Sequence, residues 1–195
     1  MHHTMFDTPV IRTLLRWLSL GILKLRGWKV IGEMPKDAPK CVMIAAPHTS
    51  NWDLPFTLMV AFGINARVYW MGKEQIFKPP FRRIMMWMGG IPVDRSKTNN
   101  MVQASVDKFS EVDNLVMIVP PEGTRSKVTY WKTGFYHIAN GAGVPILLGF
   151  LDYARKEGGS LGTFETTGDV EKDMEAIKAR YAHIGAKKSD LYQVE

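Results

Sequence analysis

Cysteine is almost absent from this chain of 195 residues, which contains only Cys41. An intramolecular disulfide and a cysteine-rich metal site are therefore excluded, and the composition suits a reducing compartment. The sequence also lacks an internal repeat, a low-complexity tract, a linker and an evident signal peptide. Charged residues interrupt its apolar N-terminal stretch too often for an ordinary transmembrane span. We expect one domain over residues 1–195, long enough to bury a substantial core.

The sequence has no block of like charges, although its overall balance is basic. It contains 25 Lys and Arg against 19 Asp and Glu, which gives a net charge of +6 and a pI near 9.4. Such a balance favours an anionic partner and does not by itself choose among nucleic acid, a phosphorylated metabolite and an anionic lipid. No nucleic-acid-binding module is recognisable, so we expect no nucleic-acid partner. Hydrophobic residues make up 46% and charged residues 23%, which is typical of a globular protein and excludes a largely disordered one.

Residues 10–28 have the periodicity of an amphipathic helix, and we treat 1–27 as an N-terminal helical segment. At 100° per residue, one broad face carries Val10, Ile11, Leu14, Leu15, Leu18, Ile22 and Leu25. The other face carries Arg12, Arg16 and Lys24, but also Leu20 and Leu23. Either the helix packs on the core, or it lies in a membrane interface with its Arg and Lys among lipid phosphates. Trp17 and Trp28 would suit the interface.

The rest of the chain alternates between strand-like and helical segments. We expect strands at 28–33, 40–46, 66–72, 91–93, 114–120 and 144–153. We expect helices at 54–63, 80–90, 99–111, 134–143 and 169–185. This alternation predicts an α/β domain whose mostly parallel central sheet is flanked by helices.

An imidazole and a carboxylate stand five positions apart in "PHTSNWD", at His48 and Asp53. On one continuous helix they would be about 140° apart, so they meet only if His48 lies in a turn and Asp53 begins a helix. Pro47 and Pro55 favour that strand–turn–helix junction, because proline is tolerated in the first helical turn but disfavours helix before it. The pair could be catalytic, or Asp53 or Ser50 could simply cap the helix.

The loop "PPEGTRS" (120–126) directly follows a buried strand, where α/β sheets commonly place ligands. Gly123 allows close approach of the backbone, and Arg125 can bind a phosphate with Thr124 and Ser126 as further donors. Alternatively, Glu122 and Arg125 form a surface ion pair.

The stretch 72–95 sets Lys73 and Arg95 on either side of a strongly apolar helix. Such a stripe is more often core than pocket, but its methionines would also suit a deformable site for a flexible chain. The apolar residues are Phe81, Ile84, Met85, Trp87 and Met88.

Two other patterns are weak. "GGSLG" (158–162) matches the serine-hydrolase elbow at Ser160, but its flanks lack the required strand and helix, so we expect a flexible glycine loop. A metal site formed by His48, Asp53 and His137 lacks dense ligand spacing, and we expect no metal.

Four segments together resemble the sequence blocks of the glycerolipid acyltransferase family, which contains the bacterial lysophosphatidate (1-acyl-glycerol-3-phosphate) acyltransferases. They occur in the family's order between about residues 40 and 150, and the short ends resemble a short bacterial branch. The segments are "HTSNWD", "GKEQIF…PPF…GGIPVDR", "PPEGTRS…KTG" and "GVPILLG".

The resemblance implies roles for individual residues. His48 corresponds to the catalytic base and Asp53 to the carboxylate that orients it. Residues that match the acceptor's phosphate-binding positions are Lys73, Arg95, Glu122, Gly123, Thr124 and Arg125. Those on the acyl-donor side are Val144 and Pro145. Pro47 and Pro120 depart from the common pattern, which leaves the choice of acceptor open.

The resemblance further implies transfer of a fatty acyl group from acyl-CoA or acyl carrier protein to a lysophospholipid, most simply 1-acyl-glycerol-3-phosphate. No cofactor is expected besides the thioester co-substrate. The expected place is the cytoplasmic face of a membrane, with peripheral or interfacial attachment. Acylation of another lysolipid or lyso-aminolipid, a serine esterase using Ser160, and a non-catalytic lipid-binding protein remain alternatives. Chain-length preference and oligomeric state are not indicated.

Overall fold

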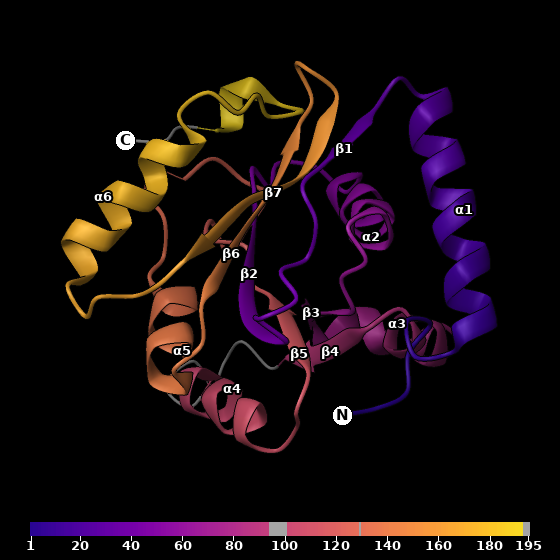
Figure 1. Ribbon diagram of the computed structural model, residues 1–195, viewed down its shortest axis with the longest axis horizontal. Coiled ribbons are helices and arrows are strands. Elements are labelled where there is room, and N and C mark those ends of the chain that lie inside the picture. The colour runs from indigo at the N-terminus through magenta and orange to yellow at the C-terminus, as the bar shows by residue number, and fades with distance from the viewer. Residues whose placement is uncertain (94–100, 129, 193–195) are drawn as a thin grey trace.

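The computed structural model describes residues 1–93, 101–128 and 130–192. Seven strands form one sheet in the order β1-β7-β6-β2-β5-β3-β4 (Figure 1). The strands are β1 (Lys29–Ile31), β2 (Lys40–Ala46), β3 (Val68–Lys73), β4 (Gly90–Val93), β5 (Leu115–Ile118), β6 (Ile146–Asp152) and β7 (Glu157–Phe164). Only the β6–β7 pairing is antiparallel among the described strands. The predicted α/β fold with a mostly parallel sheet is confirmed.

Helices cover both faces of the sheet (Figure 1). The α-helices are α1 (Pro9–Leu25), α2 (Asp53–Gly63), α3 (Arg82–Trp87), α4 (Met101–Ser110), α5 (Gly134–Ala142) and α6 (Val170–Tyr181), with short 3₁₀ turns at η1 (Glu74–Phe77) and η3 (Ser189–Leu191). In α6, the aligned Met174, Ile177 and Tyr181 are all buried, as their helical spacing predicts.

Two hydrophobic clusters fill the space between the sheet and its helices. Side chains alternate across a strand, so β2 sends Cys41 and Met43 into the cluster beneath α1 and α2, and Val42 and Ile44 into the cluster beneath α4, α5 and α6. Because both faces of β2 are covered, its sequence is almost continuously apolar. Because these strands are parallel, their carboxyl ends lie at one edge of the sheet.

Helix α1 packs on α2 with only a small part of its broad apolar face, because Leu15 is the residue of that face that contacts the core cluster. Ser19 and Leu23 are its buried residues, and Arg16 Nη1 donates to Phe62 O at 3.2 Å. Most of the broad face is turned outward: Leu14 is 64% exposed and Leu25 is 88% exposed. Val10, Trp17, Leu18 and Ile22 are exposed on the same helix.

Trp28 does not lie at the surface, contrary to the expectation that it would suit a membrane interface. It is only 8% exposed and packs against the rings of Phe56 and Tyr153. Trp17 is exposed, and its place in a membrane interface stays a prediction.

The expectation that the apolar stripe of α3 forms core is wrong for its largest residues. Phe81, Ile84 and Trp87 are exposed, whereas Met85 and Met88 are half-buried. The N-terminal segment holds α3 from one side, because Met5 N–H donates to Trp87 O at 2.8 Å. The segment that precedes α1 therefore contacts the end of α3.

The predicted flexible glycine loop at 158–162 is instead part of strand β7. Its glycines allow close packing: a Cβ on Gly159 would collide with the carbonyl of Ile31 in the neighbouring β1. Ser160 is buried within this strand, and its hydroxyl accepts the N–H of Gly162 at 3.1 Å. No strand–turn–helix elbow surrounds Ser160, which removes the basis of the esterase alternative.

Candidate functional site

The strand–turn–helix junction predicted around His48 is present. Strand β2 ends at Ala46 and α2 begins at Asp53, with Pro55 in its first turn. The Asp53 side chain does not cap α2. Its Oδ2 atom reaches back and accepts the backbone N–H groups of Thr49 at 2.8 Å and Ser50 at 2.7 Å. The carboxylate therefore stabilises the turn that carries the histidine.

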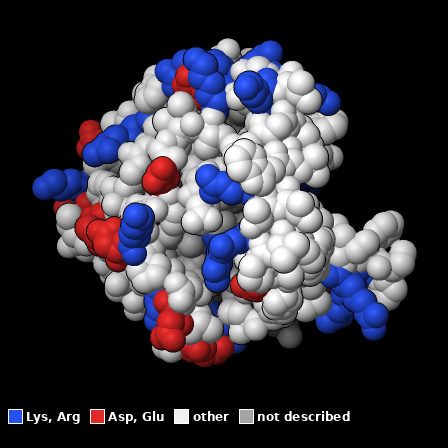
Figure 2. All heavy atoms as spheres, turned by 45° about the vertical axis from the view of Figure 1, so that its right-hand side comes forward, with Lys and Arg blue, Asp and Glu red and all other residues white. Residues whose placement is uncertain are grey.

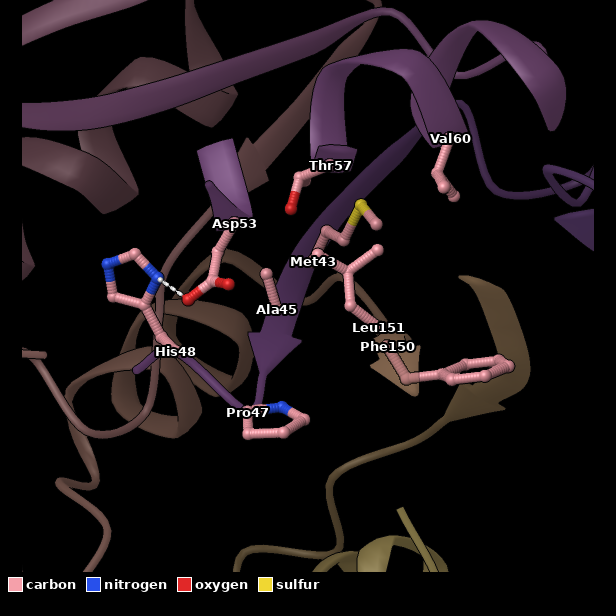
Figure 3. Close-up of a pocket in the computed structure, with 9 residues that line it drawn as sticks. All are labelled: Met43, Ala45, Pro47, His48, Asp53, Thr57, Val60, Phe150 and Leu151. Atoms are coloured by element: carbon pink, nitrogen blue, oxygen red, sulfur yellow. Dashed lines mark ion pairs between the residues drawn. The ribbon is translucent and has the colours of Figure 1, made fainter. Parts of the chain in front are cut away.

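His48 and Asp53 face each other across this turn (Figure 3). Nδ1 of His48 lies 3.3 Å from Oδ2 of Asp53, and the other ring nitrogen points away from the carboxylate. The His48 side chain is 23% exposed and the Asp53 side chain 3%. A small void of about 10 Å³ remains among the side chains around the pair. With Nδ1 protonated toward Asp53, Nε2 is free to take a proton.

Tyr153 is a partner of this pair that the sequence patterns missed. Its hydroxyl donates to Asp53 Oδ1 at 2.8 Å. Burial, followed by the charge of Asp53 beside it, raises the pKa of Tyr153, so the phenol keeps its proton. One sequence feature could have indicated Tyr153: it directly follows the predicted strand that became β6, and ligand sites of α/β sheets commonly lie at the carboxyl ends of the strands. Asp53 thus uses both oxygens and accepts only, which fits an ionised carboxylate.

Glu122 supports His48 from the opposite side. Its Oε1 accepts the His48 backbone N–H at 3.0 Å, and the residue is 3% exposed. Burial raises the pKa of Glu122 to about 7. The expected contact of Glu122 with the acceptor's phosphate does not fit its position, because its carboxyl group is buried behind the turn and does not line the pocket that His48 faces. Glu122 and Arg125 form no ion pair in the described structure.

His48 opens onto a pocket of about 350 Å³ that combines cationic, polar and apolar walls. Lys73 comes from the end of β3, and Gly123, Thr124 and Arg125 come from the loop after β5. Apolar side chains line the remaining wall, among them Leu54, Trp70, Met71, Ile76 and Ile118. Residues predicted from separate segments thus meet around one imidazole.

Two of the predicted site residues are not part of this assembly. A third, Arg95, lies outside the described residues. Val144 and Pro145 stand before β6, next to the beginning of β2, because Pro145 O accepts the N–H of Val42. Strand β2 separates that edge from His48 by roughly 20 Å at about 3.3 Å per residue. A role for Val144 and Pro145 in contacting a donor at His48 is therefore corrected: they pack at the opposite edge of the sheet.

Cys41 is unsuited to nucleophilic chemistry. It is completely buried, and burial raises the pKa of its thiol to about 12. Across the described ranges, no group of three or more His, Cys, Asp or Glu side chains is placed to hold a metal ion.

Comparison with known proteins agrees with this arrangement. A sequence profile of the acyltransferase family matches residues 28–147. The chain is 30% identical to the 1-acyl-sn-glycerol-3-phosphate acyltransferase of Haemophilus influenzae over 141 residues, which cover 68% of this chain and 57% of that protein. It is 30% identical over 132 residues to the Salmonella typhimurium enzyme of the same name, covering 63% of this chain and 52% of that protein. The chain thus spans little more than half the length of these curated relatives.

The fold also has a counterpart of known structure. The crystal structure of the 1-acyl-sn-glycerophosphate acyltransferase from Thermotoga maritima superposes with a TM-score of 0.60. The match covers 87% of this chain and 78% of the other at 17% sequence identity, and it therefore supports the fold alone. Because the family profile covers more than half of the chain and includes the His48–Asp53 turn and the Arg125 loop, the chain belongs to the acyltransferase family.

Proposed function

We propose that this chain is an O-acyltransferase that moves a fatty acyl group from a thioester to the free hydroxyl of a lysophospholipid, most simply 1-acyl-glycerol-3-phosphate. The observation that carries this function is the single pocket in which His48, oriented by Asp53, lies with Lys73 and Arg125. Curated relatives named as 1-acyl-sn-glycerol-3-phosphate acyltransferases support the choice of acceptor.

The chemistry follows from the orientation of the imidazole. An alcohol is a poor nucleophile at neutral pH, and His48 Nε2 would take its proton as the oxygen attacks the thioester carbonyl. The new C–O bond forms, the C–S bond breaks, and the proton held by His48 passes to the leaving thiolate. Asp53, fixed by Tyr153 and by two backbone N–H groups, stabilises the imidazolium in between.

The cationic wall of the pocket suits the acceptor's phosphate. Arg125 offers a planar fork for phosphate oxygens, Thr124 adds a hydroxyl, and Lys73 adds a second positive charge. The apolar wall suits the acyl chain. Acylation of a different phosphate-bearing lysolipid would use the same groups.

A thiol-release assay with acyl-CoA and lysophosphatidate tests the function. We expect His48→Ala to reduce kcat by at least about a hundredfold, because it removes the general base. We expect Arg125→Ala to raise the acceptor KM by about tenfold or more with a smaller effect on kcat, because a charged hydrogen bond is lost. His137→Ala, on the exposed surface of α5, is the matched control.

Near-normal turnover by His48→Ala would refute the mechanism. An unchanged acceptor KM in Arg125→Ala would refute the phosphate site. A panel of lysolipids and lyso-aminolipids with one labelled donor decides the acceptor. A protein that binds lipid but turns over no donor–acceptor pair would instead be the non-catalytic alternative.

The outward face of α1 and the exposed residues of α3 suggest how the enzyme meets its lipid substrate. Figure 2 shows a broad expanse of uncharged atoms on this side of the molecule, with Lys and Arg side chains near its margins. Ile76, which lines the His48 pocket, is itself 45% exposed. None of the described helices is long and apolar enough to cross a membrane. The proposed attachment is therefore interfacial, with α1 lying along a lipid surface at the cytoplasmic face.

Point variants test this attachment better than deletion of residues 1–26, because Phe6 and Leu23 belong to the core. We expect the double variant Leu14→Gln, Leu18→Gln to bind anionic liposomes at least about tenfold more weakly, because each leucine contributes more than 1 kcal/mol when buried in lipid. Tyr130→Gln, at an exposed aromatic residue outside α1 and α3, is the control. Unchanged sedimentation of the double variant would rule out this use of α1.

A further inference from the structure

A second hollow adjoins Asp53 through Tyr153, and it shares no lining residue with the pocket that His48 faces. Its volume is about 390 Å³, and Tyr153, which donates to Asp53, forms part of its wall. Trp28 and Trp52 supply further aromatic surface, and Trp52 is 54% exposed. We infer that this hollow binds the nucleotide end of a coenzyme A thioester, so that donor and acceptor phosphates are held in separate pockets.

The charge of the hollow is entirely positive. Arg26, Lys156 and Lys187 line it, and its described lining includes no Asp or Glu. Within the described chain, none of these three cations forms an ion pair with a carboxylate. Clustered cations without anionic neighbours repel one another, and a ligand carrying several phosphate groups would relieve this repulsion. A nucleotide with a diphosphate and a further phosphate fits that charge pattern.

The cations come from separate elements that are brought together over aromatic rings. Arg26 follows the end of α1, Lys156 lies in the β6–β7 turn, and Lys187 follows α6. Lys187 Nζ lies 5.1 Å from the ring centroid of Trp52 and 5.5 Å from that of Tyr153. This cation–π contact fixes the ammonium group at the mouth of the hollow, beside flat surfaces on which a purine base can stack.

The backbone of Lys156 gives an independent indication. Its φ of 54° lies in the left-handed region, which glycine or asparagine adopts with less strain. The turn nevertheless carries a lysine, and its side chain extends over the neighbouring turn: a Cβ built at Gly27 would lie 3.7 Å from Lys156 Cδ. The amino group of Lys156 thereby lies close to Gly27, next to Arg26 of the hollow.

The position of the hollow suits a donor and not a second acceptor. The acceptor's phosphate already has Lys73 and Arg125, on the side where His48 is open. Two contacts, Tyr153 to Asp53 and Asp53 to His48, link the hollow to the imidazole. The pantetheine arm of coenzyme A has an extended length on the order of 15 Å, similar to five residues of extended chain, and can cover that separation.

The binding test uses the whole chain and coenzyme A itself, which carries no acyl group, so its outcome does not depend on turnover. The first variant is Lys156→Gly, which removes the amino group while relieving the left-handed strain, so the fold should remain at least as stable. The second is Lys187→Gln. The control is Lys188→Gln, which changes an adjacent lysine whose side chain does not line the hollow. By titration calorimetry, we expect Kd for coenzyme A to rise about tenfold in each variant and little in the control.

A kinetic comparison, which rests on the function proposed above, identifies the part of the donor that is bound. We expect both variants to raise the KM for acyl-CoA about tenfold while leaving the KM for acyl-pantetheine, which lacks the nucleotide, and that for the acceptor unchanged. If no donor is turned over but coenzyme A binds with this variant pattern, the proposed function fails and the binding site stands.

Three results would overturn the nucleotide site. One is unaltered coenzyme A binding in Lys156→Gly and Lys187→Gln. Another is weaker binding of both variants to phosphatidylglycerol vesicles with unchanged coenzyme A binding, which would make the hollow a lipid headgroup site. The third is turnover with acyl carrier protein alone and no detectable binding of coenzyme A by the wild-type chain.

Discussion

Glu122→Gln is a direct test of the buried carboxyl group behind the catalytic turn. The substitution preserves the shape of the side chain and an Oε1 acceptor for the His48 N–H, which Glu122 binds at 3.0 Å. It removes only the ability to ionise. We therefore expect the variant to keep its fold and most of its kcat, and to differ from the wild type in how stability depends on pH.

The magnitude follows from the pKa of Glu122, which burial raises from 4.5 to about 7. Between these pH values the folded protein keeps a proton that the unfolded chain has released, so the wild-type free energy of unfolding falls as pH rises. At about 1.4 kcal/mol per pKa unit, this loss reaches about 3 kcal/mol above pH 7. Glutamine does not titrate, so the stability of the variant relative to the wild type should grow by that amount across the window.

Urea unfolding followed by tryptophan fluorescence, repeated from about pH 4.5 to about pH 8, measures this difference. Glu33→Gln, at an exposed glutamate, is the control and should show no such trend. If the difference in free energy of unfolding between Glu122→Gln and the wild type stays constant over this pH window, burial does not raise the pKa of Glu122 in the folded protein. The reasoning from its burial would then be wrong.

Three further substitutions have expected outcomes. Tyr153→Phe removes the hydroxyl that donates to Asp53, so kcat should fall about tenfold with little change in either KM, whereas the exposed Tyr130→Phe should have no effect. Gly159→Ala places a methyl group against the Ile31 backbone and should lower the free energy of unfolding by about 1–3 kcal/mol. The control Gly134→Ala places its methyl group in open space and should be tolerated. Equal stability of the two variants would contradict the tight β1–β7 packing. Leu23→Ala, at a fully buried site on α1, should cost about 2–5 kcal/mol in the same urea assay, and a smaller loss would mean that α1 is only loosely packed.

The centre of the site was predictable because local constraints point to one arrangement. Pro47 and Pro55 restrict where a helix can begin, and an imidazole and a carboxylate five positions apart can meet only across that junction. The apolar run of β2 likewise predicts a strand covered on both faces. These features depend on residues that are neighbours in sequence, so the physical rules for short segments apply to them.

Other features depend on contacts between distant residues. Tyr153 reaches Asp53 from 100 positions away, and no local pattern marks that hydrogen bond. The glycines of β7 suggested a loop. In the structure they allow the β7 backbone to approach β1 closely, and sequence spacing does not reveal such an approach. For α1, leucines stand on both sides of the helix, so periodicity alone could not decide that Leu23 packs inward while Leu14 and Leu18 face outward.

The turn at His48 is held by Asp53, its neighbour in the sequence, and by groups from distant segments, whereas Lys73 and Arg125 line the pocket. Asp53 and Glu122 bind opposite sides of the turn, and Thr49 also accepts the N–H of Lys188, the residue before η3, at 3.2 Å. The turn therefore has little freedom to move, and His48 presents one ring nitrogen to the lysolipid pocket. An arrangement in which Asp53 orients the imidazole and Lys and Arg line the pocket suits the proposed reaction, in which phosphate-bearing substrates bind and positive charge develops on the imidazole.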